Sequence, residues 1–170
     1  MGELLLVRHG ETDWNREHRI QGHTDTPLNA SGLEQVRALA AGLTATTLAA
    51  VYSSDLTRAF QTATAVAAVH GIPVQLDRDL REKDFGSWEG MTDTEIAERF
   101  PHAVRGRWGD GETIEEVAER AIGAIERICA RHLTDAVLVV SHGGTLRAIL
   151  GHLGVEHGPI RNCEVFRVGY

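Results

Sequence analysis

The feature that most constrains the fold is a set of short apolar runs that alternate with helical segments. Residues 4–7 and 136–141 are apolar almost without interruption, as expected of strands that are buried on both faces of a sheet. Two further runs lie at 48–53 and 72–76, and the tail at 162–168 alternates less cleanly, which is typical of an edge strand. Because helices separate the runs, the sequence predicts a layered α/β fold with a largely parallel sheet.

Helix start and stop signals fill the segments between these runs. Three sites fit the capping box, in which a hydroxyl and a carboxylate satisfy free backbone N–H groups: Ser31 with Glu34, Thr92 with Glu95, and Thr113 with Glu116. A further helix is predicted from about Asp55 to near Gly71. Its expected apolar face consists of Leu56, Phe60, Ala63, Val66 and Ala67.

Length and composition fit one domain. The chain has 170 residues, of which 42% are hydrophobic, and this is enough to bury a core. We expect a single domain over residues 1–170. Residues from about 86 to 111 are rich in glycine, tryptophan and charge, so this segment is predicted to be an irregular, lid-like insertion.

The charge of the chain limits its partners. A net charge of −7 argues against a protein that coats nucleic acid, and it means that any phosphate site must be a local positive pocket. The two cysteines, Cys129 and Cys163, lie far apart with neither metal-ligand nor redox spacing. The apolar start at 4–7 is too short for a signal sequence or a membrane span. We therefore expect a cytoplasmic protein with no nucleic-acid or membrane partner.

Four polar motifs lie at the ends of the predicted elements, where α/β folds bind their ligands. They occupy residues 8–12, 53–59, 80–90 and 141–145 and read RHGET, SSDLTRA, LREKDFGSWEG and SHGGT. The first, second and fourth directly follow predicted strands. The ligand site is therefore expected to be built from these motifs.

The motifs contain the groups that phosphoryl transfer needs, which are mainly positioning and charge stabilisation. A neutral imidazole such as that of His9 is a good nucleophile near pH 7. Arg8 and Arg58 offer planar forks that pair two phosphate oxygens. The helix start near Gly143 offers free N–H groups, and Glu82 is the candidate acid that protonates the leaving oxygen.

The adjacent residues Arg8 and His9 raise a geometric difficulty, because neighbours in a regular strand point to opposite faces. Gly10 is expected to permit a sharp turn that brings both side chains into one pocket. His142 is likewise followed by two glycines. Both turns are expected to bring backbone N–H groups close to a phosphate.

The four motifs together resemble those of the histidine phosphatase (phosphoglycerate mutase-like) superfamily. They occur in that family's order and at comparable spacing, and the resemblance spans almost the whole chain. One such motif alone is a weak signal, whereas four in order are specific. The resemblance implies a phosphoglycerate mutase-like fold: a three-layer α/β/α sandwich with a mostly parallel sheet and an antiparallel edge strand.

The resemblance also implies roles for individual residues. His9 would be phosphorylated and then dephosphorylated, and Glu82 would act first as general acid and then as general base. The transferring phosphoryl group would be surrounded by Arg8, Arg58 and His142. Further phosphate or substrate contacts would come from Asn15, Gln21, Gly22 and Gly143. No metal and no cofactor is implied, because cationic side chains take the electrostatic role of a metal.

Seven histidines are left outside these motifs and are expected at ordinary surface positions, with His23 a candidate for the pocket entrance. They are His18, His23, His70, His102, His132, His152 and His157. The chain has no HExxH and no Cys/His pair at ligand spacing, so a zinc site is not predicted.

Two enzymatic outcomes share such a site. A phosphatase lets water attack the phosphohistidine, whereas a mutase returns the phosphoryl group to a second hydroxyl. Mutases of the family are longer chains, in which an insert after the acid motif carries paired arginines. In this sequence only Arg105-Gly106-Arg107 resembles that clamp, which favours a phosphatase acting on a small phosphorylated metabolite.

Two further alternatives stay open. Small family members with similar motifs include α-ribazole phosphatases of cobalamin synthesis as well as broad-specificity phosphatases. A catalytically weak phospho-ligand-binding protein is an alternative of another class, although the intact His9, Arg58, Glu82 and His142 argue against it. The edge strand at the C-terminus permits either a monomer or a homodimer.

Overall fold

A computed structural model gives the structure of residues 1–102 and 109–170. Within these residues, five strands form one sheet in the order β3-β2-β4-β1-β5. Their bounds are β1 Glu3–Arg8, β2 Ala50–Ser53, β3 Val74–Leu76, β4 Ala136–Ser141 and β5 Val165–Gly169. The first four strands pair in parallel, and β5 runs antiparallel to β1 at one edge. The predicted mostly parallel sheet with an edge strand at the C-terminus is confirmed.

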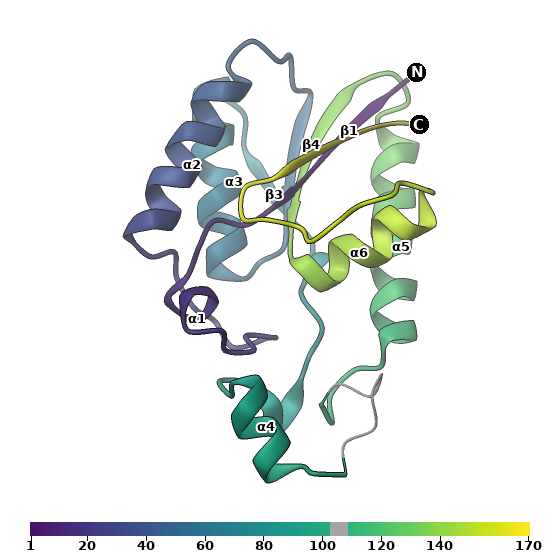
Figure 1. The fold of residues 1–170 in the computed structure, drawn as a ribbon. Helices are drawn as coiled ribbons and strands as arrows, with labels where there is room; N and C mark the ends of the chain where they lie inside the picture. Colours follow the sequence, from purple (N-terminus) through teal and green to yellow (C-terminus); the bar gives the residue numbers. More distant parts are fainter. Residues whose placement is uncertain (103–108) are drawn as a thin grey trace.

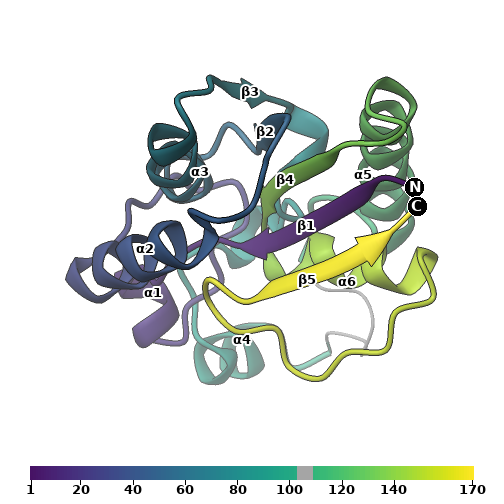
Figure 2. The same cartoon turned by 90° about the horizontal axis from the view of Figure 1, so that it is seen from above.

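Helices cover both faces of the sheet, which confirms the three-layer α/β/α arrangement (Figures 1 and 2). α2 and α3 pack on one face, and α5 and α6 pack on the other. The helices are α1 Asp13–Arg16, α2 Ala30–Leu43, α3 Thr57–His70, α4 Asp93–Arg99, α5 Ile114–Arg131 and α6 Gly143–His152. Short 3₁₀ turns at Arg78–Leu80 and Gly86–Trp88 precede α4.

The uninterrupted apolar sequence of β1 follows from this layering. Leu4 and Leu6 pack into the core under α5 and α6, whereas Leu5 and Val7 pack into the core under α2 and α3. All four side chains are fully buried. Each contributes on the order of 1.5–3 kcal/mol relative to an exposed position, so both faces of the strand must be apolar.

Two of the three predicted capping boxes are confirmed, at Thr92 and at Thr113. The prediction at Ser31 is wrong, because the N-cap of α2 lies two residues earlier in the sequence. Asn29 is the N-cap, and its side-chain oxygen accepts the Gly32 N–H at 2.8 Å. Asparagine caps a helix as well as serine does, so Ser31 falls within the first turn instead.

The predicted apolar face of the helix at α3 is confirmed for Leu56, Ala63, Val66 and Ala67, which are all buried, but not for Phe60. Phe60 is 41% exposed, whereas Arg58 is fully buried on the side toward the sheet. The expectation that Phe60 lies in the core is therefore wrong, since a long cationic side chain occupies that face. The predicted end of the helix is confirmed, because Gly71 takes the left-handed conformation at φ 66° that ends many helices.

Within the segment from 86 to 111, residues 86–102 are more regular than the expected lid. α4 lies within it, beyond the end of the sheet (Figure 1). Its inner side is apolar: Ile96 and Trp88 are buried, and the rings of Trp88 and Phe100 lie 5.7 Å apart. The arginines of the possible clamp, Arg105-Gly106-Arg107, lie outside the described residues. Every helix within residues 1–102 and 109–170 is too short or too polar to cross a membrane.

Candidate active site

Three adjacent strands bring the polar motifs together. Arg8 at the end of β1 pairs with Ser141 at the end of β4, and β2 ends beside β4. The residues that follow these strands therefore meet at one edge of the sheet. The rings of His9 and His142 lie with their centroids 5.1 Å apart. The structure thus joins the first, second and fourth motifs, as the sequence predicted.

The difficulty over Arg8 and His9 is resolved because β1 ends at Arg8, so the strand alternation does not extend to His9. The predicted reason was different and is wrong. Gly10 does not have a left-handed φ. Instead, a Cβ at this position would lie 2.9 Å from the Gly32 carbonyl oxygen, so glycine allows the start of α2 to pack closely.

Asn162, which the sequence analysis did not single out, holds the end of β1 in place. Its Nδ2 donates to the His9 carbonyl at 2.9 Å and to Asn15 Oδ1 at 3.3 Å. The next residue, Cys163, donates its backbone N–H to the Arg8 carbonyl at 2.9 Å. These contacts join segments about 150 residues apart in the chain, so no local sequence signal reveals them.

The environment of His9 fixes its tautomer and its charge. Nδ1 lies 2.7 Å from the Gly10 carbonyl oxygen, and a carbonyl only accepts hydrogen bonds. Nδ1 therefore carries the proton, and Nε2 keeps a free lone pair. Burial, followed by the charges of Arg58 and Arg8, lowers the pKa of His9 well below its ordinary value. At neutral pH the residue is an uncharged imidazole that can act as a nucleophile.

Two guanidinium groups flank this imidazole: that of Arg58 is buried and that of Arg8 is partly buried. Arg58 Nη atoms donate to the Gly22 and Thr24 carbonyls at 2.7 and 3.0 Å, and Arg8 Nη1 donates to the Ile160 carbonyl at 2.6 Å. Neither arginine has a carboxylate in ion-pair contact within the described residues. Burial lowers the pKa of Arg58 to about 10, so it stays cationic at neutral pH. Buried cations without a bonded carboxylate favour a bound anion.

Three polar atoms at this edge of the sheet lack a partner in the described part of the chain. They are Arg8 Nε, Arg58 Nε and His142 Nδ1, all buried. His142 Nε2 lies 2.9 Å from Ser54 Oγ, and burial followed by the charge of Arg58 lowers the pKa of His142 well below its ordinary value. When the serine hydroxyl donates to Nε2, Nδ1 carries the free N–H. Three unpaired nitrogens around His9 therefore offer donors to one anion.

The side-chain carboxylate of Glu82 lies against the first turn of α6. Its two carboxylate oxygens accept the backbone N–H groups of Gly144 at 3.0 Å and Thr145 at 3.1 Å. A Cβ on residue 144 would lie 2.5 Å from Glu82 Oε1, so only glycine fits there. The expected role of the two glycines needs correction: the Gly144 N–H is bound to Glu82, which leaves the Gly143 N–H available to a phosphate.

Arg120 on α5 fastens the segment that carries Glu82, and the sequence analysis missed it. Its guanidinium donates to the Asp79, Arg81 and Glu82 carbonyls at 2.8–2.9 Å and to both carboxylate oxygens of Glu112. A five-donor fork can satisfy such a set, whereas lysine cannot. The helical pattern of α5 gave no signal of this contact, because its acceptors are mostly backbone oxygens.

The remaining predicted contacts hold the site together in different ways. Asn15 lines the cavity described below. Gln21 accepts hydrogen bonds from two threonine hydroxyls, and the Gly22 carbonyl accepts from Arg58. His23 was a candidate for the pocket entrance, but its Nε2 lies 2.8 Å from the Glu82 carbonyl and it is not among the described lining residues.

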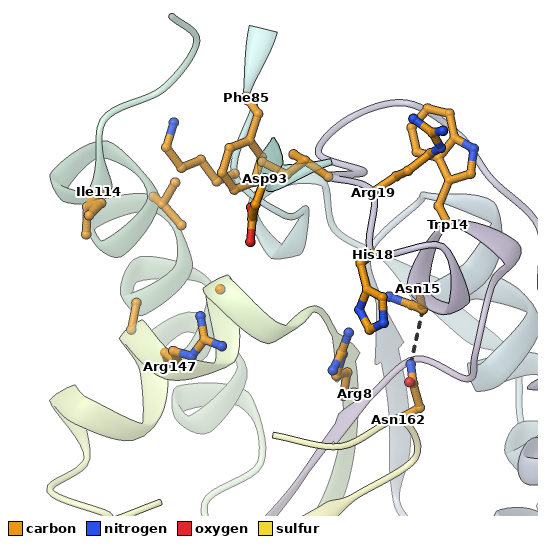
Figure 3. Close-up of a pocket in the computed structure, with 15 residues that line it drawn as sticks. Arg8, Trp14, Asn15, His18, Arg19, Phe85, Asp93, Ile114, Arg147 and Asn162 are labelled. Atoms are coloured by element: carbon orange, nitrogen blue, oxygen red, sulfur yellow. Dashed lines mark hydrogen bonds between the residues drawn. The ribbon is translucent and has the colours of Figure 1, made fainter. Parts of the chain in front are cut away.

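A cavity of about 860 Å³ opens beside Arg8 and the first turn of α6 (Figure 3). Arg8, Asn15 and Gly144 lie in its wall, which connects it to the phosphoryl site. Its other walls come from α1, α4, α5, α6 and the segments at 18–20 and 83–85, and they combine apolar with charged residues. Their apolar residues are Trp14, Ile20, Phe85, Ile114, Val117 and Ala148. The space suits the part of a phosphate ester that leaves.

Comparison with known proteins agrees with this geometry. The model of the histidine phosphatase superfamily (branch 1) matches residues 4–169. The chain belongs to this superfamily. Histidine phosphatases similar to it include phosphoglycerate mutase-like protein 4 of Arabidopsis thaliana, which is 39% identical over 86% of this chain and 69% of the relative.

Two more relatives carry phosphatase names. The metal-independent phosphoserine phosphatase of Arabidopsis thaliana is 41% identical over 86% of this chain and 66% of its own length. A mycobacterial glucosyl-3-phosphoglycerate phosphatase, solved with VO3, superposes with a TM-score of 0.88 at 29% identity over 98% of this chain and 90% of that chain. The chain is thus an enzyme of the histidine phosphatase type, a phosphatase of small phosphorylated metabolites.

Proposed function

We propose that the protein hydrolyses phosphomonoesters through a phosphohistidine at His9. His9 Nε2 attacks phosphorus, the P–O bond to the leaving group breaks, and Glu82 gives its proton to the leaving oxygen. Water then attacks the phosphohistidine, Glu82 takes a proton from that water, and inorganic phosphate leaves with His9 restored. The acid and base roles of Glu82 alternate, so the cycle returns every group to its starting state.

The observation that carries this proposal is the pair of guanidinium groups, one buried and one partly buried, beside an uncharged imidazole. Arg8 and Arg58 each keep an unpaired Nε, as His142 keeps an unpaired Nδ1. Oxygens of a transferring phosphoryl group would satisfy all three donors. The low pKa of His9 keeps its lone pair free at neutral pH. A neutral ligand would leave these three donors without a charged acceptor.

Glu82 supports the proposal through its position. Its carboxylate contacts Gly144, which also lines the cavity for the leaving group. An acid at this wall can reach the bridging oxygen of an ester whose phosphoryl group lies against His9. The proposal assigns no step to a metal, because the arginines supply the positive charge that a metal would otherwise bring.

Hydrolysis is favoured over a mutase reaction, which is the runner-up. Relatives carry both kinds of name, so the acceptor has to be measured. An assay that follows the conversion of 3-phosphoglycerate, with and without 2,3-bisphosphoglycerate, separates the two. A panel of phosphoglycerates, phosphoserine, α-ribazole phosphate, sugar phosphates and nucleotides tests the α-ribazole alternative.

The proposal includes a cytoplasmic protein that acts as a monomer or homodimer on a small phosphorylated metabolite, without nucleic acid or membrane. The two cysteines are free thiols, in agreement with a reducing compartment. Light scattering of the purified chain measures the oligomeric state.

Hydrolysis of p-nitrophenyl phosphate in the presence of EDTA tests the proposal. We expect activity in the unmodified chain, its loss in His9→Ala, and its retention in His152→Ala, which removes an exposed histidine at the far end of α6. Activity that survives His9→Ala, or that appears only with added metal, would contradict the mechanism. Phosphate binding without turnover would favour the phospho-ligand-binding alternative.

A further inference from the structure

The cavity beside the phosphoryl site is cationic although the protein is acidic. Among its described lining residues, Arg8, Arg19, Lys83 and Arg147 carry positive charge, and Asp93 is the one acid. The chain as a whole has a net charge of −7. A local excess of positive charge next to a site that already binds a phosphoryl group points to a second anion.

Three of the four cations already have partners. Arg8 donates to a backbone carbonyl and flanks His9. Arg19 forms ion pairs with two glutamates. Lys83 Nζ donates to two backbone carbonyls and lies over the ring of Phe85. Because these three cations already bond to groups of the protein, they are weaker candidates for binding a ligand in the open part of the cavity.

Arg147 differs from the other three. Within residues 1–102 and 109–170 its guanidinium forms no hydrogen bond and no ion pair. It lies on α6, four residues after Gly143 and three after Gly144, and so on the same face of the helix as the first turn that meets the phosphoryl site. Figure 3 shows Arg147 and Arg8 projecting into the same cavity from different elements.

The positive charges of Arg8 and Arg147 also repel each other. Burial lowers the pKa of Arg8, Glu82 opposes this, and the like charge of Arg147 adds to the lowering. The two guanidinium groups are therefore within electrostatic reach. An anion between them would replace this repulsion with attraction.

We propose that Arg147 binds a second anionic group on the leaving-group part of the substrate, so that the preferred substrates are phosphomonoesters that also carry a carboxylate or a second phosphate. This rests on the proposed function. A guanidinium fork binds either anion, and apolar side chains such as Trp14 and Phe85 line the same cavity, where they can contact the carbon skeleton.

Substrate pairs that differ in one anionic group test this. O-Phosphoserine is compared with O-phosphoethanolamine, and 3-phosphoglycerate with glycerol 3-phosphate, for the carboxylate. Fructose 1,6-bisphosphate is compared with fructose 6-phosphate for the second phosphate. We expect kcat/KM to favour the more anionic member of at least one kind of pair by about tenfold, mostly through KM. The kind of pair that responds identifies the anion.

Arg147→Met is the decisive variant, and Arg37→Met on the exposed side of α2 is its matched control. The ratio of the two members of a responding pair should fall toward one in Arg147→Met and stay unchanged in Arg37→Met. A ratio within one preparation cancels any loss of folded enzyme. A ratio near one in the unmodified chain, or a ratio that Arg147→Met leaves intact, would overturn the proposal.

The same assays separate this inference from the proposed function. If the chain hydrolyses the neutral members and p-nitrophenyl phosphate in a His9-dependent way but shows no preference, only the second-anion site fails. If no phosphomonoester is hydrolysed, the proposed function itself fails.

Discussion

The phosphoryl site and the cavity beside it are built from different parts of the fold. His9, Ser54 and His142 follow three adjacent parallel strands, and their neighbours Arg8 and Arg58 are held by backbone carbonyls. The cavity shares Arg8 with that region, but most of its wall comes from α1, the segments at 18–20 and 83–85, and the helices α4, α5 and α6. The first region is fixed by the core of the sheet, and the second can vary without disturbing that core. The difference separates the chemistry, which the strands position, from the choice of substrate.

Substitution of Arg58 is expected to give the largest effect on this contrast. Arg58→Gln removes a buried cation from the phosphoryl site, so we expect kcat/KM to fall about 1000-fold for every substrate. Arg147→Met in the cavity should change only the preference among substrates. Steady-state kinetics on p-nitrophenyl phosphate and 3-phosphoglycerate measure both. A loss in Arg58→Gln that depends strongly on the leaving group would contradict the division between the two regions.

Gly143 and Gly144, at the start of α6, give a sharper test at the boundary between the phosphoryl site and the cavity. Gly144→Ala places a Cβ 2.5 Å from Glu82 Oε1 and must displace this carboxylate, whereas a Cβ at Gly143 meets Arg8 Nε at 3.6 Å, an ordinary contact. We expect Gly144→Ala to lower kcat on 3-phosphoglycerate about 100-fold, as loss of a general acid does. Gly143→Ala should stay within a few-fold of the unmodified chain, and equal losses in the two variants would contradict the role of Glu82.

Arg120 connects the acid segment to α5, and its loss should act through Glu82. Arg120→Gln is expected to lower kcat about thirtyfold on substrates with a poor leaving group and less on p-nitrophenyl phosphate, whose leaving group needs little protonation. Arg127→Gln on the same helix removes an exposed arginine that pairs with Asp77 and Asp79, so it is the matched control. An equal effect of Arg120→Gln on both substrates would indicate a merely structural role.

The buried uncharged state of His9 predicts a smaller effect, on stability. Its pKa is lowered in the folded protein, so as the pH falls below about 6.5 the unfolded chain binds a proton that the folded chain does not. The free energy of unfolding should therefore decrease toward acid by up to about 1.4 kcal/mol per pH unit for this histidine. Urea unfolding at several pH values from about 7.5 down to about 5.5, on both sides of the ordinary histidine pKa, measures this change in the free energy of unfolding.

Variants isolate the contribution of His9 to that slope. His9→Asn should lose stability less steeply than the unmodified chain as the pH falls, whereas His152→Asn, which alters an exposed histidine, should keep the original slope. Identical slopes in all three proteins would mean that His9 is not buried in its uncharged form.

The sequence predicted the sheet and the meeting of the polar motifs at one of its edges, because both depend on local signals. An uninterrupted apolar strand followed by a polar motif specifies its own position in a parallel sheet, as β1 with His9 and β4 with His142 show. Ser31 and Phe60 were misplaced, since a shift of two residues in the N-cap of α2 and the burial of Arg58 in α3 leave no trace in composition.

The contacts that fasten the site could not be predicted. Asn162 and Arg120 act on backbone carbonyls of segments that are distant in the chain, and backbone acceptors carry no sequence signal. The role of Gly10 was misread for a related reason. Glycine is required at position 10 because the backbone at Gly32 packs closely against it, and not because of the backbone angle of Gly10 itself.

The most direct test of the central claim is detection of the phosphorylated nucleophile. The purified chain is mixed with phosphoserine or p-nitrophenyl phosphate, quenched in alkali within milliseconds, and digested for mass spectrometry. We predict one phosphoryl group on the peptide that contains His9, labile to acid and absent from His9→Ala. Turnover without a phosphorylated peptide, or a phosphoryl group on another residue, would contradict the claim that His9 is the nucleophile.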